Sequence, residues 1–180
     1  VPTLVDNKPD MIVLHIGSND IEENADPQDL AERIINIGQK SRRMGVNEIL
    51  ISAILNRNDF YLNRIIAQVN DILQKRCVEN NFSFISNANI TPYYLWKDGL
   101  HLQDRGTEVL SLNITSMLNH QIINNSFFWQ VENHLDLTIS KKSDIEGLID
   151  LRKKHPDNPM IGYLNVNSLS GKIEHIKNLL

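Results

Sequence analysis

The chain has 180 residues, 41% of them hydrophobic, which is enough for one sizeable buried core with an appended segment. Its formal net charge of −4 lacks the basic excess of a general nucleic-acid-binding surface, although a local basic patch is compatible with it. The single cysteine, Cys77, excludes an intrachain disulfide and a Cys-x-x-Cys metal site, and fits a reducing compartment. No apolar run approaches the ~20 residues that span a bilayer, and the first residues lack a secretory signal. We therefore expect an intracellular, cytoplasmic protein without a membrane span.

The first predicted element is an apolar strand over residues 11–16, which ends at Gly17-Ser18-Asn19-Asp20. A short run rich in Ile, Val and Leu is typical of a strand covered on both faces of a parallel sheet. Gly17 permits a sharp turn, the Asn19 amide could donate to an oxyanion, and Asp20 could hold the turn. Taken alone, a strand-ending turn is the simpler interpretation. His15, inside the strand, is expected to be neutral and to lie in the core or to support a site.

Helices and strands then alternate along the chain. Asp26-Pro27 predicts a helix start and Gly45 its end. The remaining predicted elements are a strand over 48–55, a helix from Asn58-Asp59 to about Cys77, a strand over 82–86 and a helix from Asp104, as its cap, to about Ile123. This alternation indicates right-handed βαβ units and a parallel sheet.

A second polar motif follows the third strand, where Asp98 precedes His101 by three residues. A turn of this length would let the carboxylate hold the imidazole ring and fix its tautomer. By itself the motif is more often a loop with an isolated histidine. The aromatic residues of the 91–96 loop before it could form the wall of a small pocket or seal an edge of the core.

Together the two motifs resemble those of the SGNH (GDSL-type) hydrolases, a family of α/β esterases and lipases. The likeness covers roughly residues 1–123 and includes Pro9-Asp10, the 54–57 segment, and Gly106 after the second motif. It implies a flavodoxin-like three-layer α/β/α fold with strand order 2-1-3-4-5, in which the three strands here are the third to fifth. It also implies a small ester or acyl substrate, no cofactor, Asn19 as the oxyanion-hole donor, His101 as the general base and Asp98 as the acid that orients it.

The chain departs from this family in one important respect. The Gly-Asp-Ser block that supplies the nucleophilic serine is absent from residues 1–180, and so is the block with a second oxyanion-hole glycine. Ser18 occupies a variable position of its block, so we expect the serine to lie before Val1. We expect the chain as given to be inactive and the 11–16 strand to lack its central partner and to form an unpaired edge. The alternative is a non-catalytic interaction module that binds protein, lipid or nucleic acid.

The composition changes after residue 123. Residues 124–159 are interpreted as a linker with a charged helical segment, and residues 160–180 as a strand, a turn and a helix. Leu164-Asn165-Val166-Asn167-Ser168-Leu169 resembles the opening of the endonuclease domain of non-LTR retrotransposons, of the endonuclease/exonuclease/phosphatase superfamily. In a complete domain of that kind, Asn165 would help to bind a divalent metal such as Mg²⁺. The resemblance implies a fragment of a LINE-type retroelement polyprotein with nucleic acid as a partner of the downstream domain. The other histidines show no metal-ligand spacing.

Overall fold

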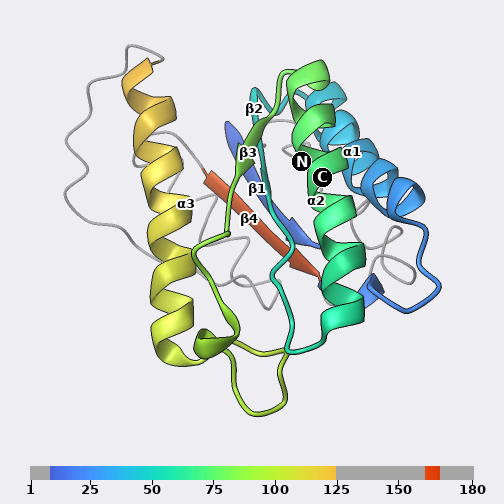
Figure 1. The fold of residues 1–180 in the computed structure, drawn as a ribbon. Helices are drawn as coiled ribbons and strands as arrows, with labels where there is room; N and C mark the ends of the chain where they lie inside the picture. The colour runs from blue at the N-terminus through green and yellow to red at the C-terminus, as the bar shows by residue number, and fades with distance from the viewer. Residues whose placement is uncertain (1–8, 125–160, 167–180) are drawn as a thin grey trace, which may run out of the picture.

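A computed structural model of the chain describes residues 9–124 and 161–166, and side-chain burial is described for residues 9–119 (Figure 1). Its elements, in chain order, are β1 (Met11–Ile16), a 3₁₀ turn η2 (Ser18–Asp20), α1 (Pro27–Arg43), β2 (Glu48–Ser52), α2 (Phe60–Asn80), β3 (Ser83–Ile85), a 3₁₀ turn η3 (Pro92–Tyr94), α3 (Asp104–Asn124) and β4 (Ile161–Val166). None of the helices in these ranges is long and apolar enough to cross a membrane.

The strands form one parallel sheet in the order β3-β2-β1-β4. The predicted α/β fold with a parallel sheet is therefore confirmed, and β1, β2 and β3 lie in consecutive order as the resemblance implies. Because all four strands point the same way, the loops after β1, β2 and β3 leave the sheet at one edge, which is where parallel sheets place their functional sites.

Apolar residues alternate between the two faces of the sheet and build a core on each. On one face Ile12 and Leu14 pack with residues of α1 and α2, the larger of the two cores. On the other face Met11 and Val13 pack against the Ile114 side of α3. Figure 1 shows the resulting three layers, with α3 on one side of the sheet and α1 and α2 on the other. Because helices cover both faces of the sheet, residues that point to either face are apolar, and the strands do not alternate apolar with polar residues.

The helix starts follow the capping signals with one exception. The Asp26 side chain accepts a hydrogen bond from the backbone N–H of Gln28 at 2.9 Å, and Asp59 caps α2 in the same way. Asp104, expected to be the cap of α3, is instead its first residue. The reason is that the backbone N–H of Thr107 bonds to the carbonyl of Gln103, at 2.9 Å, so the helical hydrogen bonds begin one residue earlier.

The second strand ends earlier than its apolar run predicts, at Ser52 rather than at residue 55. The side-chain amide of Asn70, on α2, accepts from the N–H of Ile54 and donates to its carbonyl, both at 2.9 Å. One side chain thus satisfies both backbone groups that a strand ladder would use, and the chain leaves the sheet here. Apolarity alone cannot distinguish this loop from a strand, because Ile54 is buried in either case.

The place of β4 in the sheet differs from the expectation. Residues 161–166 form the expected strand, but it pairs in parallel with all six residues of β1, from Met11 opposite Ile161 to Ile16 opposite Val166. The expectation that β1 has an unpaired edge is therefore wrong. The change of composition after residue 123 also predicts that residues 124–180 pack outside the hydrolase-like core, and for residues 161–166 this is wrong as well. A complete hydrogen-bond ladder satisfies the edge groups of β1, which an isolated edge strand would leave exposed. The linker with its charged helix and the 172–180 helix lie outside the described residues, and the domain boundaries at 123 and 159 stay a prediction.

Candidate functional site

Asp98 and His101 form a hydrogen-bonded pair at the edge where the strands end. The carboxylate oxygen Oδ2 of Asp98 lies 2.7 Å from Nδ1 of the His101 ring. The other oxygen, Oδ1, accepts the backbone N–H groups of Leu100 at 2.9 Å and of His101 at 3.0 Å. The carboxylate therefore fixes both the ring and the turn that carries it. A donor at Nδ1 leaves Nε2 as the basic nitrogen, the tautomer that a general base requires.

These bonds control the ionisation of Asp98. The N–H groups of Leu100 and His101, followed by the His101 ring, lower the pKa of the Asp98 carboxyl group from 3.8 to about 2. Hydrogen bonds to a carboxylate favour its charged form, so Asp98 is an anion at every physiological pH. Both side chains are accessible, with 73% of His101 and 49% of Asp98 exposed. The pair can thus meet a substrate directly.

The loop that presents this pair is closed by backbone bonds. Trp96 N–H bonds to the His101 carbonyl at 2.7 Å, and Gly99 N–H to the Trp96 carbonyl at 2.9 Å. Leu95 and Leu102 form an antiparallel bridge at its base. Leu95 is the buried residue of the aromatic loop, whereas Tyr93 and Trp96 are mostly exposed. These two aromatic rings therefore do not seal the core.

Asn19 is presented by the turn after β1. Gly17 adopts a left-handed conformation with φ +97°, and the backbone N–H of Asp20 bonds to its carbonyl at 3.1 Å, which closes the Ser18–Asp20 turn. A Cβ atom at Gly17 would lie 3.0 Å from Ile34 Cδ1 and 3.1 Å from Ile54 Cδ1. The turn thus needs glycine for both its conformation and its space. Asn19 itself is exposed at the tip.

The loop after β2 connects these two loops. The guanidinium group of Arg57 donates to the Ser18 carbonyl and, at 3.5 Å, to the Ile21 carbonyl, on either side of Asn19. The next residue, Asn58, donates its backbone N–H to the Gly99 carbonyl at 2.9 Å. Successive residues of one loop therefore contact both the Asn19 turn and the Asp98–His101 loop.

Gly99 marks how closely these loops approach. It has φ +69°, and a Cβ atom there would lie 2.7 Å from Cβ of Asn58, which is closer than two Cβ atoms approach without a steric clash. Glycine is therefore required between Asp98 and His101 by the neighbouring loop as well as by its own backbone.

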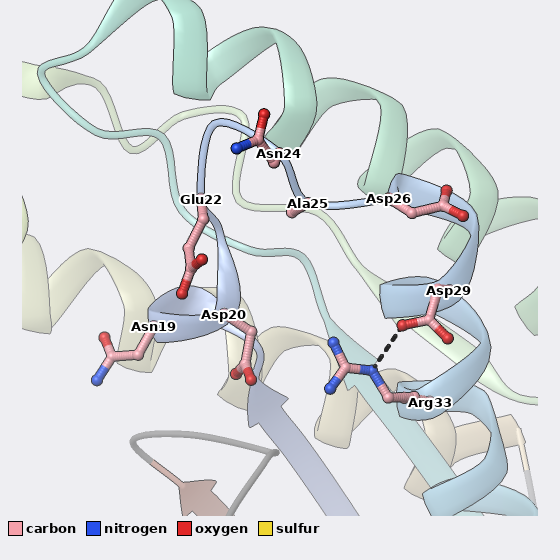
Figure 2. A pocket seen from close by; sticks show the side chains of 8 residues that line it. All are labelled: Asn19, Asp20, Glu22, Asn24, Ala25, Asp26, Asp29 and Arg33. Atoms are coloured by element: carbon pink, nitrogen blue, oxygen red, sulfur yellow. Dashed lines mark ion pairs between the residues drawn. The ribbon is translucent and has the colours of Figure 1, made fainter.

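An open hollow of about 280 Å³ lies beside the Asn19 turn. Figure 2 shows its lining, to which η2 contributes Asn19 and Asp20, and α1 contributes Asp29 and Arg33, joined by an ion pair of 3.1 Å. Four carboxylates and one guanidinium group line it, so its surface is polar and mainly acidic. Asp98 and His101 do not belong to this lining. Because both motifs follow strands of one parallel sheet, the sequence predicts that Asn19, Asp98 and His101 open onto one crevice. This hollow is not that crevice, and the connection between the two loops is the Arg57-Asn58 loop.

A polar network on the α3 face of the sheet was only partly foreseen. His15 Nδ1 lies 3.0 Å from Oγ of Ser52, and the Asn87 amide donates to the same oxygen at 2.9 Å. Asn113, on α3, donates to Asn87 Oδ1 at 3.0 Å. Burial lowers the pKa of His15, which favours the neutral ring that the sequence predicts. The network ties the ends of β1, β2 and β3 to α3. Its other members carried no signal in the sequence.

Arg57 and Asn63 also escaped the sequence analysis as functional residues. Arg57 belonged to the segment that carries the family resemblance, but no role followed from it. Asn63 lies on the apolar-patterned helix α2, and its amide bonds to both the N–H and the carbonyl of Arg57, at 2.7 and 2.8 Å. This contact joins a helix residue to a loop residue six positions earlier, and the apolar pattern of the helix does not indicate it.

The described residues contain no group of three or more His, Cys, Asp or Glu side chains arranged to hold a metal ion. Asn165 lies in β4, opposite His15 in the register of the sheet. The metal role of Asn165 therefore stays a prediction about a complete endonuclease domain.

Comparisons with known proteins agree with this architecture. The model of the GDSL-like Lipase/Acylhydrolase family matches residues 1–109. A crystal structure from Bacteroides fragilis, described as that of an acylhydrolase, is similar with a TM-score of 0.57 and 20% identity over 66% of this chain and 65% of that one. A GDSL-like lipase from Bacteroides thetaiotaomicron has a TM-score of 0.54 and 14% identity, covering 66% of each chain. The chain thus spans about two thirds of these proteins. None of the curated proteins matches it significantly.

Proposed function

Because the chain belongs to the GDSL-like lipase/acylhydrolase family, we propose that it carries the proton-transfer and oxyanion-binding part of an ester hydrolase that acts by acyl transfer. His101 is the general base, Asp98 orients it, and Asn19 donates to the oxyanion. The substrate is a small ester or acyl compound. The nucleophile is a serine of a Gly-Asp-Ser block, which residues 1–180 do not contain.

The proposed reaction has two steps. The serine hydroxyl attacks the acyl carbonyl while Nε2 of His101 takes its proton, and the carbonyl oxygen becomes an anion that the Asn19 amide stabilises. Nε2 then gives the proton to the departing alkoxide as the ester C–O bond breaks. In the second step a water molecule replaces the serine hydroxyl, and the acid and the free serine are released. Asp98 stays ionised throughout and stabilises the imidazolium ion.

The observation that supports this proposal most is the 2.7 Å contact between Asp98 Oδ2 and His101 Nδ1, made by a carboxylate whose other oxygen is occupied by two backbone N–H groups. This double anchoring gives the ring one orientation, which a general base needs and an isolated surface histidine does not have. The link through Arg57 and Asn58 adds that the Asn19 turn and this loop are held by a common element.

The test compares p-nitrophenyl acetate hydrolysis by the chain and by the same chain preceded by a family segment with Gly-Asp-Ser. We expect turnover by the longer protein only. His101→Ala and Asp98→Asn in that protein should each lower kcat by a factor on the order of 10³ or more, and Asn19→Ala by about 10²–10³. Turnover by residues 1–180 that Ser18→Ala abolishes would identify Ser18 as the nucleophile and overturn the assignment. Inactivity of both proteins would favour the non-catalytic interaction module.

We further propose that the chain derives from a LINE-type retroelement polyprotein, with residues 160–180 at the start of an endonuclease domain that acts on nucleic acid. The support is the sequence resemblance around Asn165 and the presence of a strand there. Its pairing with β1 gives this strand a second role, as part of the hydrolase-like sheet. Sequencing the surrounding reading frame tests the proposal. A frame without the remaining metal ligands and catalytic histidine of an endonuclease would refute it.

A further inference from the structure

The guanidinium group of Arg57 bonds to backbone carbonyls rather than to a carboxylate. It is half-buried, and its Nη atoms donate to the backbone carbonyls of Ser18 and Ile21, while its Nε is buried and has no hydrogen-bond partner in the described part of the chain. Among the described residues it forms no ion pair at salt-bridge distance. Burial disfavours the charge of Arg57 and lowers its pKa, and the nearby charge of Asp59 offsets this only in part, so the placement costs stability. In return, the two hydrogen bonds of Arg57 fix its distance from the carbonyls of Ser18 and Ile21, on either side of Asn19.

The backbone of Arg57 is itself held rigidly. The side-chain amide of Asn63 bonds to both its N–H and its carbonyl, and Asn70, seven positions further along the same helix, does the same for Ile54. Residues seven apart lie on one face of a helix, so α2 fixes the loop at two points. The hydrogen bonds of the Arg57 guanidinium group therefore couple the position of the Asn19 turn to that of α2.

The same loop also fixes the base. Asn58 N–H bonds to the Gly99 carbonyl, inside the segment that carries Asp98 and His101, and the absence of a side chain at Gly99 lets the two backbones meet. Orientation errors are costly in a catalytic centre, where a displacement of about 1 Å can lower the rate about 100-fold. A dipeptide in contact with both loops is the element that can set their separation.

We propose that Arg57 is the positioning residue of this centre, which holds the oxyanion donor Asn19 at a fixed place relative to His101. The inference rests on the proposed function for its chemical meaning, but the geometry it asserts can be tested without turnover. Arg57 touches the turn rather than the substrate, so its loss should misplace Asn19 without removing a binding group.

Arg42 is a matched control. It too donates to backbone carbonyls, those of Asn80 and Asn81 at 3.3 and 3.0 Å, but it does so at the opposite end of α1 from the Asn19 turn. Arg57→Met and Arg42→Met therefore remove the same kind of bond and keep a similar apolar stem. Arg42→Met also removes a 3.4 Å bond to the Asn47 carbonyl and the contact of the guanidinium group with the Phe82 ring, so it is the stricter control for general loosening. Arg57→Lys restores a charge that can reach one carbonyl and should recover part of the effect.

The first measurement is the NMR signal of the Asn19 side-chain amide, assigned with Asn19→Asp, together with the Gly99 backbone amide and the melting temperature. We expect Arg57→Met to shift the Asn19 signal strongly, Arg57→Lys to shift it less, and Arg42→Met to leave it unchanged at a comparable loss of melting temperature. An Asn19 signal that is the same in Arg57→Met as in the parent would overturn the proposal. So would equal shifts in the Arg42→Met and Arg57→Met proteins, since these would mean general loosening. If Arg57→Met does not fold, the Arg57→Lys comparison decides.

The second measurement uses the serine-bearing protein. Arg57→Met should lower kcat for p-nitrophenyl acetate by about 10- to 100-fold with little change in KM. A higher KM at unchanged kcat would show that Arg57 binds substrate and would overturn the positioning role. A shifted Asn19 signal in a protein that hydrolyses nothing would support the positioning role and refute the proposed function, so the two failures are distinguishable.

Discussion

Gly17→Ala should destabilise the protein and displace Asn19 in one step. The residue has φ +97°, and a left-handed conformation costs an L-amino acid about 1–2 kcal/mol relative to glycine. The new Cβ would also meet Ile34 Cδ1 at 3.0 Å and Ile54 Cδ1 at 3.1 Å. Both atoms are the ends of flexible side chains in a buried cluster, so they can move a few tenths of an ångström at a cost of about 1 kcal/mol. The free energy of unfolding should therefore fall by about 2–3 kcal/mol.

Gly45→Ala is the control for this change. Gly45 has φ +91° and lies just past the end of α1, away from the Asn19 turn, so its substitution carries a similar conformational cost without the contacts to Ile34 and Ile54. Urea unfolding should give a loss of about 1–2 kcal/mol for Gly45→Ala, and Gly17→Ala should lose more. In the serine-bearing protein only Gly17→Ala should also lower kcat. A Gly17→Ala protein as stable as the Gly45→Ala protein, with full activity, would refute the reasoning.

Two further predictions concern pH. The pKa of Asp98 is about 2 in the folded loop against 3.8 ordinarily, so its stabilisation of the loop is complete above pH 3.8 and is lost as the pH falls through about 2. The His101 backbone amide signal should report this loss in an acid titration, and Asp98→Asn should abolish the transition. The pKa of His15 is lowered from 6.5 by burial, so the unfolded chain takes up a proton first and stability falls as the pH drops below 6.5. Urea midpoints at about pH 8 and about pH 5 should differ less in His15→Gln than in the parent, and an unchanged difference would exclude His15 as the cause.

The fold was predictable where local chemistry and global packing agree. Asp26 and Asp59 cap helices because their side chains reach N–H groups two and three residues ahead, a relation written in the sequence. The contact of Asp98 with His101 is likewise local. The end of β2 was not predictable, because the deciding group is the amide of Asn70, which comes from the following helix.

The connection between the site loops was beyond sequence reasoning for the same reason. Arg57 reaches the Ser18 carbonyl across thirty-nine positions of the chain, and nothing in the residue types near Arg57 specifies that target. The partner of β1 was also missed. Residues 161–166 were correctly expected to form a strand. The place beside β1 was assigned to the first strand of the family fold, whereas the apolar edge of β1 accepts any parallel strand of suitable length.

The position of β4 has a consequence for the order in which the chain folds. Strands β1, β2 and β3 are joined by crossovers of one helix each, whereas the ladder between β1 and β4 closes a loop from residue 16 to residue 161. Loop-closure entropy rises by only about 0.6 kcal/mol for each doubling of length, so the long loop costs little stability, but distant contacts form slowly. The three-stranded unit is thus expected to form first and to recruit β4 last. Since a parallel strand directs alternate backbone groups to its two neighbours, amides of β1 should acquire protection from hydrogen exchange in two interleaved sets, one early with β2 and one late with β4.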